Sequence, residues 1–154
     1  MDRFLGRYAK RVDAKGRVSV PAPFRAVAGR SGFEGLYCVQ SLWHPAIEAG
    51  GQALIDSIDA VVGGFDPLSL DHDQVATALL GAGEILALDA EGRVGLPGWI
   101  KDATGIVDEV IFVGQGGKFQ LWSPERFAGF EADARARTAA LLQARGRTAS
   151  GGTP

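Results

Sequence analysis

Arginine and lysine side chains near the N-terminus are the residues with the clearest chemical potential in this 154-residue sequence. Guanidinium and ammonium groups bind phosphate and carboxylate oxygens through charge-assisted hydrogen bonds. The cluster therefore predicts an anionic partner, although the same charges could instead pair with acidic residues of the chain itself. Residues 1–30 contain eight cations and two carboxylates, namely Arg3, Arg7, Lys10, Arg11, Lys15, Arg17, Arg25 and Arg30 against Asp2 and Asp13.

The remainder of the chain has a different charge balance. Between residues 31 and 100 only Arg93 opposes ten carboxylates, and residues 101–154 are nearly neutral. The overall net charge of −2 therefore conceals a basic N-terminal segment. This asymmetry favours an anionic partner that binds at one place on the molecule.

Several of these charged residues belong to a sequence that occurs twice. The decapeptide VDAKGRVSVP at 12–21 recurs 76 residues later as LDAEGRVGLP at 88–97. The tetrapeptide LWHP at 42–45 recurs 79 residues later as LWSP at 121–124. Two matches in the same order predict a duplicated unit with one small insertion.

The repeated decapeptide is typical of a tight turn between two strands. The carboxylate of Asp13 or Asp89 can accept backbone N–H groups two residues further on. Gly16 or Gly92 can adopt the positive φ that closes a hairpin with a bulge. Alternating apolar residues on the far side of the turn predict a strand that ends at the following proline.

Hydrophobic spacing and prolines predict the elements around these turns. Short helices are expected at 23–28 and 98–104, each followed by an apolar strand. Pro45 and Pro124 are expected in the first turns of two further helices, where proline is tolerated. The two apolar strands are expected at 36–39 and 110–113. The remaining expected elements are a strand at 118–122 and a helix at 70–80 with Asp71 and Asp73 near its positive end.

The sequence contains few groups that could support catalysis. His44 and His72 are its only histidines and Cys38 is its only cysteine, without the spacing of a metal site or of a nucleophile and its base. Gly114–Lys118 lacks the spacing of a phosphate-binding loop. No uncharged run is long enough to span a membrane. We therefore expect a cytoplasmic protein that is not an enzyme and has no catalytic residues, cofactor or metal site.

The turn motif and its duplication resemble a known family. VDAKGRVSVP is similar to the hairpin signature of the SpoVT/AbrB class of small DNA-binding domains. Two such units, each with an Asp-x-x-x-Arg motif, resemble the MraZ transcriptional regulators from Arg3 to the helix near Leu142. The resemblance implies an α+β fold, in which tandem SpoVT/AbrB-like units form a swapped-hairpin β-barrel core with peripheral helices. The expected segments are a first repeat at 1–62, a linker helix at 63–79, a second repeat at 80–142 and a flexible tail at 143–154.

The resemblance also implies a biological role. Members of the family bind short G-rich direct repeats in double-stranded DNA upstream of the division and cell-wall gene cluster, including their own promoter. They form ring-shaped homo-oligomers, here expected as octamers or dodecamers, in the cytoplasm and associated with the nucleoid. Repression of that cluster and antagonism with its rRNA methyltransferase are further implications.

A protein-interaction or antitoxin-like module on the same fold is the alternative function that the resemblance leaves open. Trp43, Trp122 and Phe119 would line the surface of such a module. The competing expectation is that these aromatic residues pack in the core or between subunits, because duplicated positions usually preserve packing.

Arg17 is the main candidate for reading DNA bases. A β-ribbon fits the major groove, where an arginine can donate paired hydrogen bonds to guanine O6 and N7. Lys15 at the tip of the turn is the next candidate. The residues expected to contact phosphates are Arg3, Arg7, Arg11 and, with the opposite strand parity, Lys10. The residues expected to shape the turns are Asp13, Gly16, Asp89, Gly92 and Arg93.

The two turns are not electrically equivalent. Residues 3–17 have six cations and one carboxylate, whereas the corresponding residues 79–93 have one cation and three carboxylates. If phosphate contacts dominate binding, the first repeat must provide them. Arg93 is then expected to stabilise its own turn, with an auxiliary contact to DNA left open. Arg17 can pair with Asp13 and still present its outer edge to a base.

Overall fold

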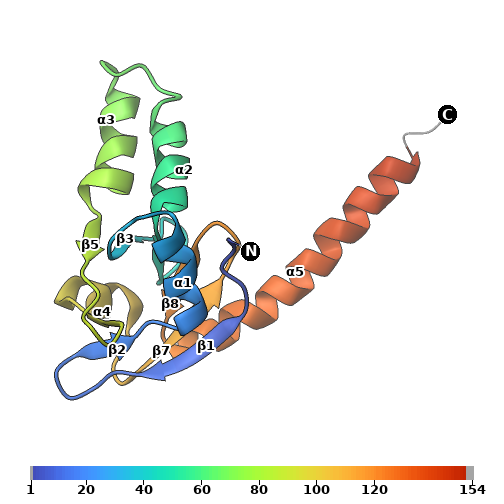
Figure 1. The fold of residues 1–154 in the computed structure, drawn as a ribbon. Coiled ribbons are helices and arrows are strands. Elements are labelled where there is room, and N and C mark those ends of the chain that lie inside the picture. Colours follow the sequence, from blue (N-terminus) through green and yellow to red (C-terminus); the bar gives the residue numbers. More distant parts are fainter. Residues whose placement is uncertain (1, 152–154) are drawn as a thin grey trace. The chain divides into compact units, whose positions relative to one another are not determined.

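The computed structural model describes residues 2–151, with side chains through residue 147. The chain forms two compact units that divide between Ser123 and Pro124. The first unit holds two β-sheets and helices α1–α4, and the second is the helix α5 (Pro124–Gly151), as Figure 1 shows. Both predicted turns lie in the first unit.

The larger sheet has six antiparallel strands in the order β1-β7-β8-β4-β3-β5. β1 of the first repeat pairs with β7 of the second, and β5 of the second repeat pairs with β3 of the first. β4 and β8 join the two halves at the centre. Each strand of one repeat therefore has a counterpart from the other repeat at the same distance from the opposite edge of the sheet. The strands are β1 (Arg7–Arg11), β3 (Leu36–Gln40), β4 (Ile47–Gly50), β5 (Glu84–Leu86), β7 (Glu109–Gly114) and β8 (Phe119–Trp122).

The smaller sheet is a two-stranded ribbon of β2 (Arg17–Ser19) and β6 (Arg93–Gly95), one strand from each repeat. Hydrogen bonds at both ends extend this pairing. The Gly16 carbonyl accepts a hydrogen bond from the Leu96 N–H (2.9 Å), and the Gly92 carbonyl accepts an equivalent bond from the other strand (3.0 Å). Each turn is thus tied to the strand of the other repeat.

The predicted hairpins form only in part. The Asp13 N–H donates to the Arg17 carbonyl (2.8 Å) and the Asp89 N–H donates to the Arg93 carbonyl (2.9 Å), so both turns close as expected. Beyond the first turn the strands diverge, because β1 enters the larger sheet and β2 enters the ribbon. β1 and β2 therefore pair mainly with strands of the other repeat, β7 and β6.

Two short helices follow the ribbon strands. α1 (Ala22–Arg30) and α4 (Gly98–Thr104) confirm the helices expected after the prolines. Phe24 of α1 and Ile100 of α4 are fully buried in the same core cluster. Phe24 also packs against Phe119 of β8, with ring centroids 4.8 Å apart. The main core of the first unit therefore draws on both repeats.

The helix predicted before the second repeat forms as α3 (Leu70–Ala76), and it continues as the π-helical turn η1 (Thr77–Gly81). Ser69 caps its start, because the Ser69 hydroxyl accepts a hydrogen bond from the His72 N–H (3.1 Å). α3 contacts α2 (Gln52–Val62). The two helices project from the larger sheet as a helical hairpin (Figure 1).

The match between LWHP and LWSP does not reflect structural equivalence. Residues 42–45 form the loop between β3 and β4, where Trp43 is 82% exposed. Trp122 instead lies in β8 and is 1% exposed, and Pro124 begins α5 as predicted. Because β4 and β8 pair at the centre of the sheet, the helices that follow equivalent strands are α2 and α5. Trp43 therefore does not pack in the core of the single chain, and its expected alternative, packing between subunits, stays a prediction.

Pro45 does not begin a helix, contrary to the prediction. The chain directly after it forms β4 instead, because this segment hydrogen-bonds to β3 on one side and to β8 on the other. The helix begins only at Gln52, after Gly51. Strand pairing at the centre of the sheet thus overrides the local preference of proline for a first helical turn.

Helix α5 runs past residue 142, where the second repeat was expected to end. It is helical to Gly151, so most of the expected tail continues the helix, and residues 152–154 lie outside the described part of the chain. Within residues 2–151 no helix is long and apolar enough to cross a membrane.

Candidate nucleic-acid interface

Asp13 organises the first turn (Asp13–Arg17) through both of its carboxylate oxygens. Oδ1 accepts hydrogen bonds from the backbone N–H groups of Lys15 and Arg17, each at 2.9 Å. Oδ2 accepts one from Arg17 Nε, also at 2.9 Å. The hydrogen bond from the Arg17 backbone is the main cause that lowers the pKa of Asp13. Gly16 closes the turn at φ +79°, a conformation that favours glycine.

The second turn (Asp89–Arg93) repeats this geometry and adds one contact. Asp89 accepts hydrogen bonds from the backbone N–H groups of Glu91 and Arg93 and from Arg93 Nε, all at 2.9 Å. In addition, Arg93 Nη2 donates to Glu91 Oε2 at 3.0 Å. The side-chain hydrogen bond with Asp89 is the main cause that raises the pKa of Arg93. Two carboxylates therefore hold the guanidinium of Arg93.

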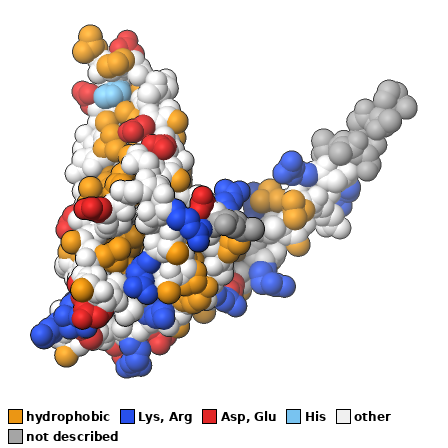
Figure 2. Space-filling model, in the orientation of Figure 1, with side chains coloured by type: hydrophobic (Ala, Val, Ile, Leu, Met, Phe, Trp, Pro, Cys, Tyr) orange, Lys and Arg blue, Asp and Glu red, His pale blue; other side chains and the backbone are white. Residues whose placement is uncertain are grey.

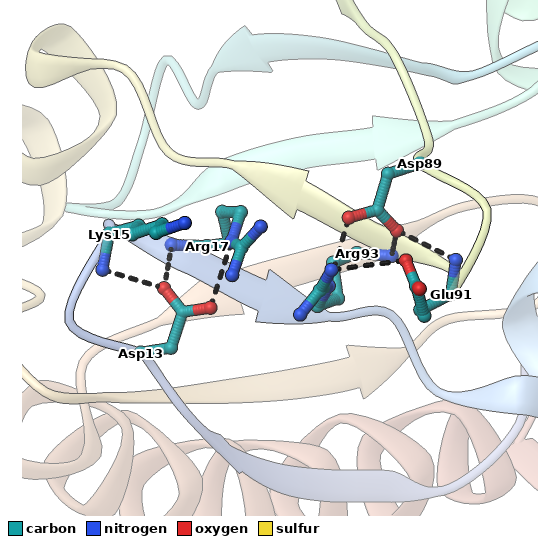
Figure 3. A network of polar contacts seen from close by, with 6 residues as sticks. All are labelled: Asp13, Lys15, Arg17, Asp89, Glu91 and Arg93. Atoms are coloured by element: carbon teal, nitrogen blue, oxygen red, sulfur yellow. Dashed lines mark hydrogen bonds and ion pairs between the residues drawn. The ribbon is translucent and has the colours of Figure 1, made fainter.

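Arg17 and Arg93 lie on the outer face of the ribbon, while Val18 and Val94 between them point into the core. Figure 3 shows the two Asp–Arg pairs at opposite ends of the ribbon. The side chain of Arg17 is 31% exposed and that of Arg93 is 28% exposed. Among the described residues, only Asp13 bonds the Arg17 side chain, and it does so at Nε. The two terminal nitrogens of Arg17 are therefore available to a ligand.

Two cations that the sequence analysis did not assign to the turns come from the opposite repeat. Lys101 of α4 reaches the first turn, where a Cβ atom built on Gly16 would lie 3.4 Å from Lys101 Nζ. Arg25 of α1 covers the second turn more closely, because a Cβ on Gly92 would lie 2.5 Å from Arg25 Cζ and 2.7 Å from Cδ. Arg25 and Lys101 are 76 residues apart, the spacing of the repeated decapeptide, so this spacing could have marked them as equivalents.

The cations of β1 lie on a different sheet from the ribbon. Arg7 and Arg11 are exposed, whereas Lys10 shares the half-buried face of Tyr8, which agrees with its predicted parity. Arg11 lies 4.0 Å from Asp108, and both side chains are largely exposed. The bridge between Val12 and Val18 brings the end of β1 beside β2.

The structure thus brings Lys15, Arg17 and Lys101 together at the first turn and places the predicted phosphate contacts on β1 and before it, with Arg3 also exposed. The first turn has three cations against one carboxylate, whereas the second turn has Arg93 and Arg25 against two carboxylates. Figure 2 shows basic and acidic side chains mixed at the lower edge of the first unit, where β2 and the first turn lie. Of the two turns, only the first therefore has excess positive charge.

Other reactive groups of the first unit have structural positions. Cys38 is fully buried in β3, and burial raises the pKa of its thiol to about 12, so the thiolate is not accessible at neutral pH. The ring of His44 packs against Trp122 with centroids 5.5 Å apart. In the described part of the chain, no group of three or more His, Cys, Asp or Glu side chains could hold a metal ion.

Comparison with known proteins shows extensive similarity to one family. The family model of the MraZ protein matches residues 78–146. A transcriptional regulator MraZ of Xanthobacter autotrophicus is 48% identical over 97% of this chain and 95% of its own length. Proteins of the same name from Beijerinckia indica and Azorhizobium caulinodans are 52% and 44% identical, over 89% and 95% of this chain and 84% and 93% of their own lengths.

Proposed function

Because the chain belongs to the MraZ family of transcriptional regulators, we propose that it acts by binding double-stranded DNA through its first turn. Arg17 reads guanine in the major groove, and Lys15 with the exposed arginines before and along β1 contacts phosphates. The observation that carries this assignment is the difference between the two arginines. No described residue pairs with the terminal nitrogens of Arg17, whereas two carboxylates hold Arg93.

The hydrogen bond between Asp13 and Arg17 Nε supports this role. A free arginine side chain loses considerable rotamer entropy when it binds a base. Asp13 holds the guanidinium plane before DNA arrives, so that less entropy is lost on binding. Asp13 itself would be repelled by phosphates, which makes a positioning role the better fit for its carboxylate.

The proposed target is a set of short G-rich direct repeats in the protein's own promoter, upstream of the division and cell-wall gene cluster, with repression as the outcome. The proposed assembly is a ring-shaped homo-oligomer of eight or twelve chains associated with the nucleoid. One turn provides few contacts, so several turns on one ring would act together on adjacent DNA repeats.

Fluorescence anisotropy with the promoter DNA tests the assignment of Arg17. We expect Arg17→Ala to weaken binding by about tenfold or more, as for loss of one bidentate base contact, and Arg93→Ala to weaken it by less than about threefold. Circular dichroism of both variants checks that the fold is intact. Equal losses from the two substitutions in folded protein would contradict the proposal.

A protein-binding module is the second candidate, and the loop between β3 and β4 favours it. Trp43 and Leu42 in this loop are both more than half exposed, and exposed aromatic side chains are frequent in protein interfaces. Electrophoretic mobility shift with the promoter DNA separates the two functions. A folded protein that fails to shift any promoter fragment at low salt would favour the protein-binding module.

A further inference from the structure

A lysine from the second repeat lies against the turn of the first. Lys101 of α4 places its Nζ 3.4 Å from the position of a Cβ on Gly16, and its side chain is half-buried there. Among the described residues, no hydrogen bond or ion pair engages its ammonium group. We propose that Lys101 binds a DNA phosphate at the first turn, so that a single DNA-binding site is assembled from both repeats. This inference rests on the proposed function.

The backbone N–H groups at and beyond the tip of the first turn are already engaged. The Gly16 N–H donates to the Asp13 carbonyl (3.0 Å), and the N–H groups of Lys15 and Arg17 donate to the Asp13 carboxylate. A phosphate that approaches residues 15–17 must therefore be bound by side chains. An ammonium group with three donors on a flexible stem fits a phosphate, which needs a positive charge but no fixed planar geometry.

Arg25 occupies the equivalent position at the second turn but is packed differently. Gly92 is buried, whereas Gly16 is partly exposed, because Arg25 lies directly over the second turn. Its Nε is buried and has no hydrogen-bond partner in the described residues. The second turn also carries two carboxylates that offset its cations. The first turn is thus partly open and has excess positive charge. The second turn is covered by Arg25, and its two cations are balanced by two carboxylates.

A position near the end of α4 is also favourable for a lysine, because the carbonyl end of a helix attracts cations. That role predicts a loss of thermal stability when the charge is removed and no change in DNA binding. It does not account for the approach of Lys101 to Gly16, a residue of the other repeat. DNA binding and stability must therefore be measured together.

The test compares Lys101→Met with Arg25→Met, which removes the matched cation at the second turn. Affinity for promoter DNA is measured by anisotropy across a series of NaCl concentrations, and Tm is measured for each variant. For Lys101→Met we expect about five- to tenfold weaker binding at about 0.1 M salt. The salt slope, which is the slope of log K against log[NaCl], should fall in magnitude by about one for each chain that contacts the DNA. Lys101→Arg should restore both values, and Arg25→Met should change binding by less than about twofold.

Three results would overturn the inference. Lys101→Met could leave affinity and salt slope unchanged, it could lower Tm alone, or Arg25→Met could weaken binding as much as Lys101→Met does. Discrimination between the promoter repeat and scrambled DNA separates this inference from the proposed function. We expect Lys101→Met to keep that discrimination, because phosphate contacts carry no sequence information. Loss of discrimination in Arg17→Ala tests the proposed function independently.

Discussion

The residue at the tip of each turn changes the contacts of the neighbouring arginine in two turns of nearly identical backbone geometry. Asp13 and Asp89 make the same three hydrogen bonds at the same 2.9 Å distances. The tip residue differs: Glu91 pairs with Arg93 at 3.0 Å, whereas Lys15 stands in its place beside Arg17, whose terminal nitrogens pair with none of the residues that the structure describes. The two turns thus share their geometry, while the reversed charge at the tip changes what the arginine can bind.

Exchanging the tip charges should therefore move the binding capacity between turns. We expect Lys15→Glu to weaken promoter binding by about tenfold or more, because the new carboxylate would pair with Arg17 and repel phosphates. Glu91→Lys should strengthen binding several-fold, because it frees Arg93. Anisotropy at low and high salt measures both effects. If neither substitution changed affinity at low salt, the tip charge would have no role in binding.

Acid should weaken the fold through both turns. Hydrogen bonds hold the pKa of Asp13 and of Asp89 below the ordinary value, so the ionised carboxylates favour the folded state. This stability is fully present above the unfolded pKa of about 4 and is lost as the pH falls through the folded pKa. Urea unfolding between about pH 3 and pH 6 should show Asp13→Asn and Asp89→Asn losing stability against the native chain at pH 6 and converging with it towards pH 3. A stability difference independent of pH would contradict this linkage.

The turn glycines should differ in their tolerance of alanine. Gly16 and Gly92 both have positive φ, so alanine at either position should lower the free energy of unfolding by about 1–2 kcal/mol. Gly92→Ala should cost more, because its Cβ would collide with Arg25. Chemical denaturation measures both. Adding Arg25→Ala should recover part of the loss in Gly92→Ala and none in Gly16→Ala, and equal costs for the two glycines would argue against the collision.

Local patterns predicted most elements, but not which strands pair. The short helices, the apolar strands and the turns were visible in the sequence because proline, glycine and alternating apolar residues define them locally. The pairing of β1 with β7 and of β5 with β3 was not, since both repeats have the same strand pattern and either copy could supply the partner. β4 was missed because Ile47–Gly50 is short and owes its extended form to strands on both sides.

The candidate site shows the same division. The Asp–Gly–Arg turns were predictable because each is closed by contacts within four residues. Lys101 and Arg25 were not, because they reach the turns across the fold from the opposite repeat. Aligning the two repeats on the decapeptide would have shown that these two cations occupy equivalent positions. It would still not have placed them, since their contact depends on how the repeats interlock.

Interlocked strands predict that neither repeat is stable as a monomer. A fragment of residues 1–79 lacks the strand that pairs with β1 and the strand that completes the ribbon. We expect it to be unfolded at low concentration or to fold only as a dimer in which a second copy supplies both strands. Circular dichroism and light scattering across a concentration series distinguish these states. A folded monomer at low micromolar concentration would contradict the interlocked fold.

At the level of the whole molecule, charge is segregated in the first unit. Residues 49–83, which include the α2–α3 hairpin, contain no Lys or Arg. Figure 1 places this hairpin away from β2, at the opposite end of the first unit. A unit that is acidic at one end and cationic at the first turn would orient itself as it approaches DNA, with the first turn leading.

In this orientation each chain contacts DNA through its first turn, which is a small interface. The affinity for DNA should therefore depend on how many first turns one oligomer presents. A ring that presents several first turns to evenly spaced DNA repeats binds the second repeat at a high effective concentration, which adds about 10²–10⁴-fold in favourable geometry. We expect DNA with several G-rich repeats to bind at least about a hundredfold tighter than DNA with one, with affinity that falls steeply as salt rises. Changing the spacing between repeats by half a helical turn should remove most of this gain, because neighbouring turns would then face opposite sides of the duplex. Anisotropy at one fixed salt concentration, with size-exclusion chromatography to establish the oligomer, measures the effect. Equal affinity for one repeat and for several would show that a single turn binds DNA without help from its neighbours.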